Sequence, residues 1–285
     1  MSSVVVTGAS TGIGWGTAKV LLGRGCRVFG SVRKQTDADR LSKDFGVNFT
    51  PLIFDVTDQG AVAKAAERVN AVIGGETLSG LVNNAGVAVP GPLLELPLEE
   101  LRRQLEVNLV GQLTVTQAFA PLLGADLSRK GAKGRIVMVS STGGRRAFPF
   151  MGPYAASKFA LEGLSESLRR ELMLFGIDVI IVAPGPIATP IWDKAEAIDL
   201  SPFASSPFAT ALGKFRQFML TTGRSGLDPE QVGRVIAGAL AVKRPKARYT
   251  VTPSPLQNLL FNSLPKRMVD RMLSRRLGLI PPTAD

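Results

Sequence analysis

The amino-acid sequence predicts an α/β fold, a single-domain doubly wound parallel sheet of about seven strands with helices on both faces. Three observations predict it. Short Val- and Ile-rich runs alternate along the chain with longer stretches of helical period. The runs are apolar at nearly every position, which is typical of parallel strands that helices cover on both sides. A glycine-rich stretch, TGASTGIG at residues 7–14, follows the first run at the expected strand-to-helix turn.

The expected strands alternate with the expected helices. Strands are expected at residues 4–6, 27–32, 47–54, 80–83, 135–140, 177–183 and 248–252. Helices are expected at residues 14–22, 58–73, 99–123, 153–175 and 228–242. We find neither an internal repeat nor a low-complexity linker, so residues 1–252 are expected to form one domain. Within it, residues 189–226 are expected to be a less regular insertion, and residues 253–285 form a tail.

The absence of histidine limits the side chains that can transfer protons or bind a metal in this chain. A Ser-His-Asp hydrolase or a dehydrogenase that relies on histidine is excluded. With a single cysteine, Cys26, a zinc site is not expected and no metal is assigned. Proton transfer must therefore use Tyr, Lys, Asp, Glu or water.

The same composition bears on location and partners. A lone cysteine excludes an intramolecular disulfide, and strand-like sequence from Val4 leaves no room for a signal peptide, so we expect a cytoplasmic protein. No apolar run approaches the roughly 18 residues of a membrane-spanning helix. The net charge of +11 fits nucleic acid, a membrane surface or an anionic cofactor. With two Tyr, two Trp and no nucleic-acid-binding motif, no nucleic-acid partner is expected.

The glycine-rich stretch is either a plain tight turn or a phosphate cradle, in which amide groups and a helix N-terminus face a pyrophosphate. Three further motifs follow at expected strand ends or on the next helix: LVNNAG (residues 81–86), IVMVSS (136–141) and YAASK (154–158). Together the four motifs resemble the short-chain dehydrogenase/reductase family over about residues 3–190. The pattern is closest to its steroid, retinol and hydroxybutyrate dehydrogenase branch. This resemblance implies a Rossmann-type fold, a nicotinamide dinucleotide and a homodimer or homotetramer.

Tyr154 and Lys158 are the expected acid–base pair. They lie one helical turn apart and share a helix face. A free tyrosine has a pKa of about 10, and lowering it by about 3 units requires about 4 kcal/mol of differential stabilisation. A lysine ammonium and a nicotinamide cation favour the phenolate, whereas burial opposes it. The alternative is that Tyr154 is an ordinary aromatic helix residue and Lys158 a solvated one.

The resemblance also implies the roles of two further catalytic residues. Ser141 hydrogen-bonds the substrate oxygen and orients it toward Tyr154; the neighbouring Ser140 is the alternative candidate for this role and is otherwise structural. Asn108, in LEVNLVG, holds with its backbone a water in the proton relay to the lysine. The alternative for Asn108, a polar side chain that satisfies a helix kink, is compatible with that role.

NADP(H) is expected as the cofactor in preference to NAD(H). Val32 stands where NAD-dependent relatives carry an Asp for the ribose 2′-hydroxyl, and Arg33 and Lys34 follow it. These cations suit a 2′-phosphate, although they could also be an ordinary solvated pair. Asp37 and Asp39 are expected in a loop, too far along the chain to serve. By resemblance, the other cofactor contacts come from Gly8, Ser10, Thr11, Gly12, Ile13, Gly14, Asp55, Val56, Asn83, Ala85, Gly86, Tyr154, Lys158, Pro184, Gly185, Ile187 and Thr189.

A lipophilic alcohol, ketone or aldehyde is the expected substrate. The insertion at residues 189–226 carries an aromatic set that lines an apolar pocket or packs a small core of its own. That set consists of Trp192, Phe203, Phe208, Phe215 and Phe218, with Met219. The expected substrate contacts are Ser141, Thr142, Phe148, Tyr154, Ile191 and Trp192.

The tail is expected to form a helix with an apolar stripe on one side and five basic residues. These are Lys266, Arg267, Arg271, Arg275 and Arg276. Such a helix either lies on an anionic membrane surface or packs its apolar side over the domain. Three functions therefore stay open: an NADP(H)-dependent oxidoreductase, an NADP-binding sensor or scaffold without turnover, and a peripheral membrane binder.

Overall fold

The structure is a computed structural model that describes residues 1–281, apart from the side chains of residues 194, 257–259 and 262. Seven parallel strands form one sheet in the order β3-β2-β1-β4-β5-β6-β7. The strands are β1 Ser3–Val6, β2 Arg27–Val32, β3 Phe49–Ile53, β4 Gly80–Asn83, β5 Arg135–Val139, β6 Asp178–Pro184 and β7 Arg248–Val251. The order reverses between β1 and β4, which confirms the doubly wound sheet.

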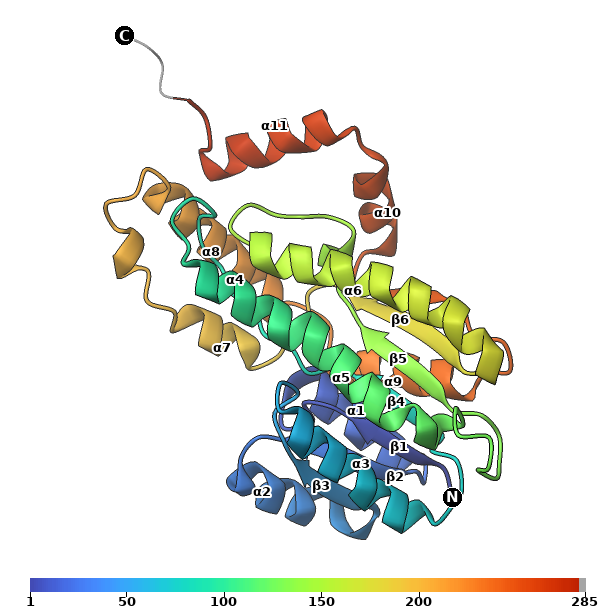
Figure 1. Cartoon of the computed structure of the whole chain (residues 1–285). Coiled ribbons are helices and arrows are strands. Elements are labelled where there is room, and N and C mark those ends of the chain that lie inside the picture. The colour runs from blue at the N-terminus through green and yellow to red at the C-terminus, as the bar shows by residue number, and fades with distance from the viewer. Residues whose placement is uncertain (282–285) are drawn as a thin grey trace.

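Helices cover both faces of the sheet (Figure 1). Those against the sheet are α1 Gly12–Gly23, α2 Gln35–Phe45, α3 Gln59–Ile73, α5 Gly111–Phe119, α6 Gly152–Glu171 and α9 Pro229–Ala241. Successive strand side chains point to opposite faces. Leu81 and Ile136 therefore pack with α3, α5 and α6, whereas the next residues, Val82 and Val137, pack with α1, α2 and α9. Both faces are apolar, as a doubly covered parallel sheet requires.

Two expectations about local structure are wrong. Asp37 and Asp39 lie in the helix α2 and not in a loop. The segment has an amphipathic spacing that explains this, because Ala38 and Leu41 are buried one turn apart. The helix expected at residues 99–123 is interrupted: α4 Leu98–Leu105 is followed by a π-helical turn, Glu106–Val110, before α5.

The insertion is more regular than expected. It contains α7 Ile191–Glu196 and the long helix α8 Ala209–Arg224. The expected single tail helix is two helices, α10 Pro255–Ser263 and α11 Lys266–Leu277, because Pro265 ends one and begins the other. No helix among residues 1–281 is long and apolar enough to span a membrane. The short 3-10 turns are Gly46–Asn48, Pro121–Leu123, Thr142–Gly144, Leu172–Phe175 and Ser201–Phe203.

The insertion (residues 189–226), the tail and the loop after β5 pack together in a third small core at one end of the molecule (Figure 1). Phe150 of the loop, Phe215 of α8 and Leu277 of α11 are buried there. Phe203 and Phe208 pack against the same core. These rings therefore pack with one another, which was one of the two alternatives for the insertion. Residues 282–285 of the tail lie outside the described part.

Candidate functional site

The glycine-rich turn between β1 and α1 depends on its three glycines. Gly8 and Gly12 have φ angles of +66° and +61°, a region that L side chains rarely adopt. Gly14 is buried, and a Cβ there would overlap the carbonyl oxygen of Gly8 and lie 2.6 Å from the Asn84 side chain. The backbone can therefore close into this turn only with glycine at each position.

Asn84, which the sequence analysis missed, braces the same turn from β4. Its side-chain amide donates to the carbonyl oxygens of Thr7, at 2.8 Å, and Gly8, at 3.3 Å. The backbone amides of Asn84 and Ala85 both donate to the Thr7 hydroxyl, at 2.8 and 2.9 Å. The doubled asparagine in LVNNAG was the available signal, because the carboxyl ends of adjacent parallel strands meet at one edge.

The turn forms a cradle for an anionic group. α1 begins at Gly12, with the exposed Thr11 as its N-cap. First-turn amides have no acceptor within their own helix, and together with the helix dipole they favour an anion. Thr189, after β6, faces the cradle from the other side, since a Cβ on Gly12 would lie 3.3 Å from its methyl group. This arrangement fits the pyrophosphate of a dinucleotide.

Basic side chains surround the end of β2. Arg33 is 70% exposed, and its guanidinium lies 3.8 Å from the Asp55 carboxylate. Lys34 is exposed at the start of α2. Arg40, on the same helix, donates to the carbonyl oxygen of Ser10 at 2.8 Å. Arg40 was missed because its segment was expected to be a loop. Three cations thus border the end of the glycine-rich turn where a ribose 2′-phosphate would lie.

Other predicted cofactor residues lie at the same edge of the sheet, but they differ in how far their side chains are buried. Asn83 turns its side chain into the core, where it donates to Thr116 Oγ1 at 2.8 Å, so only its backbone faces the edge. Val56 is buried against Gly111. Gly86 is exposed and lies beside Asn108.

The segment after β6 completes this edge. Pro184 ends the strand, and the Gly185 amide donates to the Val251 carbonyl oxygen at 2.8 Å. Ile187 is buried and bridges to Leu227. The nicotinamide contacts predicted for this segment stay predictions.

Tyr154 and Ser141 are brought together above the end of β5. A Cβ on Gly143 would lie 3.3 Å from both Ser141 Oγ and the Tyr154 ring, so the two side chains flank the same turn. The Gly143 amide donates to Ser141 Oγ at 3.0 Å, which fixes the serine rotamer. Burial raises the pKa of Tyr154, and the Ser141 hydrogen bond lowers it with a smaller effect. The phenol is therefore held protonated, ready to donate.

Lys158 lies on the same face of α6 as Tyr154, one turn further. Its ammonium is 5.9 Å from the centre of the Tyr154 ring and donates to the Val139 carbonyl oxygen at 2.8 Å. Burial lowers the pKa of Lys158 from 10.5 to about 8, and the Glu162 carboxylate opposes that effect. Lys158 is thus buried and aimed at the end of β5, so the solvated alternative does not hold.

Asn108 lies in the π-helical turn between α4 and α5. Its side-chain oxygen accepts from the Val87 amide at 2.8 Å. Its side-chain amide donates to the Val87 carbonyl oxygen at 3.0 Å and to Ser157 at 3.1 Å. The side chain therefore satisfies the helix kink and ties it to α6. The role predicted for its backbone stays a prediction.

Glu162 was missed, although it lies one turn beyond Lys158. Its buried carboxylate accepts from Ser140 Oγ at 2.9 Å, from Arg248 of β7 at 2.9 and 3.1 Å, and from Arg145 at 3.3 Å. This explains the structural role of Ser140. We call these four residues the Glu162 cluster. It joins β5, β7, α6 and the loop that carries Ser141.

The structure places the predicted substrate residues in different surroundings. Phe148 packs against that core and is partly buried. Trp192 donates from its indole to the Ile187 carbonyl oxygen at 2.6 Å and packs on Gly223. Ile191 is 42% exposed, and Thr142 begins the 3-10 turn after Ser141. Their substrate contacts stay predictions.

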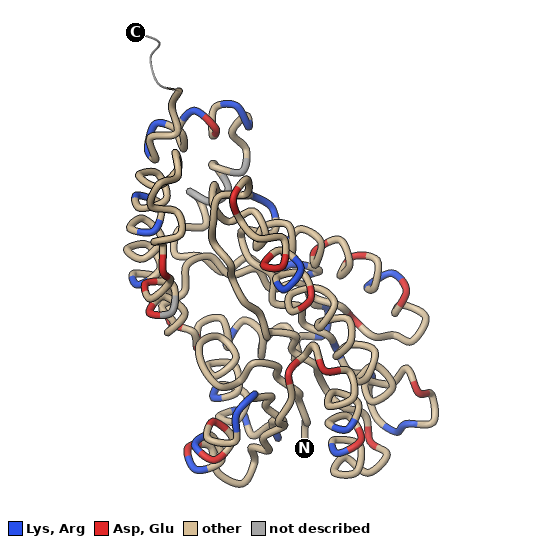
Figure 2. The backbone as a smooth tube through the Cα atoms, turned by 60° about the vertical axis from the view of Figure 1, so that its left-hand side comes forward, with Lys and Arg blue, Asp and Glu red and all other residues tan. Residues whose placement is uncertain are grey.

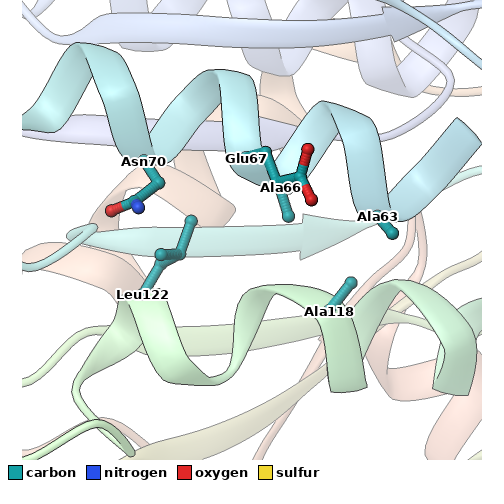
Figure 3. Close-up of a pocket in the computed structure, with 6 residues that line it drawn as sticks. All are labelled: Ala63, Ala66, Glu67, Asn70, Ala118 and Leu122. Carbon is teal, nitrogen blue, oxygen red and sulfur yellow. The ribbon is translucent and has the colours of Figure 1, made fainter.

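A cavity of about 230 Å³ lies elsewhere, between α3 and α5 (Figure 3). It is lined by Ala63, Ala66, Glu67, Asn70, Ala118 and Leu122. Alanines provide half of this lining, and none of the motif residues reaches it. It is a shallow gap between two packed helices and has no part in the chemistry.

Comparison with known proteins points to one family. The model of the short chain dehydrogenase family matches residues 2–199. The chain is 40% identical over 281 residues to an NADPH-dependent 3-dehydrocapnine reductase from Ornithobacterium rhinotracheale, with 97% of this chain and 98% of the relative covered. It is 32% identical to a 3-ketodihydrosphingosine reductase from Bacteroides thetaiotaomicron, over 97% of this chain and 96% of that one. A solved short-chain dehydrogenase from Streptomyces avermitilis superposes with a TM-score of 0.76 at 27% identity, covering 98% and 96% of the two chains.

Proposed function

We propose that this chain, which belongs to the short-chain dehydrogenase family, is an NADPH-dependent reductase of a ketone carried by a lipophilic molecule. The observation that carries the proposal is that Tyr154 and Ser141 flank Gly143, with the buried Lys158 ammonium 5.9 Å from the centre of the Tyr154 ring. This pair lies at the same edge of the sheet as the glycine cradle.

NADPH is supported by residues at two places. The cradle at Gly8, Gly12 and Gly14 fits the pyrophosphate, and Arg33 with Arg40 offers guanidinium groups to a 2′-phosphate. The relative from Ornithobacterium is named as NADPH-dependent. When bound, the cofactor supplies the hydride that reduces the carbonyl carbon.

The chain's own residues handle the oxygen and the proton. The substrate carbonyl oxygen accepts hydrogen bonds from Ser141 and Tyr154. Tyr154 donates its proton to that oxygen while the carbon accepts the hydride, so the product is an alcohol and Tyr154 is left as a phenolate. Lys158, with a pKa of about 8, is largely protonated at neutral pH, and its charge stabilises this phenolate.

A lipophilic ketone is supported by the relatives and by the surroundings of the site. Two relatives are named as reductases of 3-dehydrocapnine and of 3-ketodihydrosphingosine, the second of which is a long-chain amino ketone. The loop between Ser141 and Tyr154 carries Phe148 and Phe150, which pack in the third core. We propose a long-chain ketone of this kind as the substrate. Assembly into a homodimer or homotetramer stays a prediction.

The test is NADPH oxidation with 3-ketodihydrosphingosine, with NADH run in parallel. Tyr154→Phe removes the proton donor, and we expect turnover to fall about 10²- to 10⁴-fold. The chain has two tyrosines. Tyr249→Phe is therefore a matched control that keeps turnover, because the Tyr249 hydroxyl accepts a local hydrogen bond from the backbone amide of Lys246, just before β7. Equal turnover by Tyr154→Phe would contradict the mechanism. NADPH binding without turnover of short- or long-chain ketones would favour a sensor.

A further inference from the structure

The two tail helices present apolar side chains to solvent in pairs one turn apart. On α10, Leu256 and Leu260 are 68% and 60% exposed. On α11, Met268 and Met272 are 49% and 46% exposed. Single exposed apolar residues are common on protein surfaces, but contiguous ones mark interaction sites.

α11 has one face that packs and one that does not. Leu277 is buried in the third core, and Val269 and Leu273, at spacings of four residues, are partly buried on the same side. The spacing of 100° per residue puts Met268 and Met272 away from that side. The packed side anchors α11 on α8, so the outward side is a fixed surface of the folded protein.

The outward side is also basic. Arg267, Arg271 and Arg275 are exposed on the side opposite Leu277. α11 contains five Lys and Arg residues and a single acidic residue, Asp270, and Figure 2 shows this basic series at the end of the molecule. We call Leu256, Leu260, Met268 and Met272, with these three arginines, the tail face.

We propose that the tail face docks this protein on an anionic lipid bilayer. Apolar side chains enter the boundary between headgroups and acyl chains, and arginines bind the lipid phosphates. A second copy of the chain would fit the tail face less well. A two-fold contact would place the same positively charged arginines opposite one another, and they would repel.

The position of the tail face connects docking to the site. The Arg146 guanidinium stacks on the Phe261 ring of α10 at 4.1 Å, and Arg146 belongs to the loop between Ser141 and Tyr154. Arg276 of α11 stacks on Phe218 of α8 at 4.3 Å. The bilayer would therefore face the side of the molecule that carries this loop. The docking proposal goes beyond the proposed reductase activity and does not depend on it.

The experiment is co-sedimentation of the full chain with vesicles of phosphatidylglycerol and phosphatidylcholine, and with phosphatidylcholine alone. We expect binding to the anionic vesicles that weakens with salt. Arg271→Glu with Arg275→Glu should lower the partition coefficient about 30-fold or more. Met268→Asp with Met272→Asp should abolish binding even at low salt. All four side chains are exposed, so circular dichroism and NADPH affinity should stay unchanged.

The matched control is Met173→Asp with Arg170→Glu, at the opposite end of α6. Met173 is 73% exposed and Arg170 is also exposed, so the control changes the same residue types outside the tail face. We expect it to bind vesicles like the wild type. The proposal is overturned if the wild type stays in the supernatant at low salt, or if the control variant loses binding equally. It is also overturned if Met268→Asp with Met272→Asp splits a dimer in light scattering and leaves sedimentation unchanged.

Discussion

Glu162→Gln tests whether the Glu162 cluster holds the loop that carries Ser141. The substitution keeps the shape and volume of the side chain but removes its charge. Arg248 and Arg145 then face a neutral amide, and Ser140 loses a charged acceptor. The side chains of Glu162 and Arg248 are only 10% and 15% exposed, so water cannot replace the lost partner fully.

The expected cost follows from that burial. Removing one partner of a buried ion pair costs about 3–5 kcal/mol, because it leaves an uncompensated charge. The glutamine oxygen still accepts one hydrogen bond, so we expect the free energy of unfolding to fall by about 2–4 kcal/mol. Glu166→Gln is the matched control on the same helix. Its pair with Arg170 is 48% and 63% exposed and should contribute about 0.5 kcal/mol or less.

Urea unfolding of the two variants and the wild type measures both quantities. A double-mutant cycle with Arg248→Met isolates the pair, since the methionine removes the charge that Glu162→Gln leaves behind. We expect the cost of Glu162→Gln to shrink in the Arg248→Met background. Equal losses for Glu162→Gln and Glu166→Gln would refute the reasoning.

The same variant has a second readout in the pH profile of turnover. The Glu162 carboxylate raises the pKa of Lys158 against the effect of burial. Without that charge, the pKa of Lys158 falls further below 8, so the alkaline loss of activity should begin at lower pH. A merely structural role of Glu162 would leave this midpoint unchanged.

Two other predictions concern Lys158 and the glycine cradle. Burial lowers the pKa of Lys158 from 10.5 to about 8, so between these values the unfolded chain binds a proton that the folded chain has lost. The free energy of unfolding therefore rises with pH in this window, by up to about 3 kcal/mol relative to the Lys158→Met variant. Urea unfolding of both proteins at a series of pH values measures this difference, and parallel plots of stability against pH would contradict the prediction. Gly14→Ala places a methyl group against the Gly8 carbonyl oxygen and the Asn84 amide, so we expect at least about a 100-fold weaker NADPH affinity by fluorescence titration. Gly23→Ala, on the same helix with no neighbour within 4 Å, should bind NADPH normally and gain about 0.5–1 kcal/mol of stability; equal affinities for both variants would show that the cradle tolerates a side chain.

The elements that the sequence predicted correctly share a strong local pattern. Most strands are runs of buried apolar residues, and all seven appear in the sheet near their expected places. The helix α2 was missed because its mean polarity is high and only Ala38 and Leu41 are buried in it. The break between α4 and α5 was missed because the π-helical turn is only five residues long and has helices directly on both sides.

Some residues of the candidate site could be predicted from the sequence and others could not. Tyr154, Lys158 and the three glycines of the cradle could be predicted, because they lie in sequence motifs that together resemble the short-chain dehydrogenase/reductase family. Glu162 could not, because its main partner, Arg248, lies 86 residues away in β7. Asn84 and Arg40 likewise contact the glycine turn from 77 and 30 residues away along the chain.

By itself, the sequence determined the fold class and limited the groups that can transfer protons. Alternating apolar runs and helical periods are local properties, and a chain without histidine must use Tyr, Lys, Asp, Glu or water for proton transfer. Tertiary structure alone decided that the aromatic side chains of the insertion pack with Leu277, that Glu162 is paired, and which side of α11 meets solvent. The physical reason is that these outcomes depend on which distant segments meet. Composition and periodicity report only how each segment folds on its own.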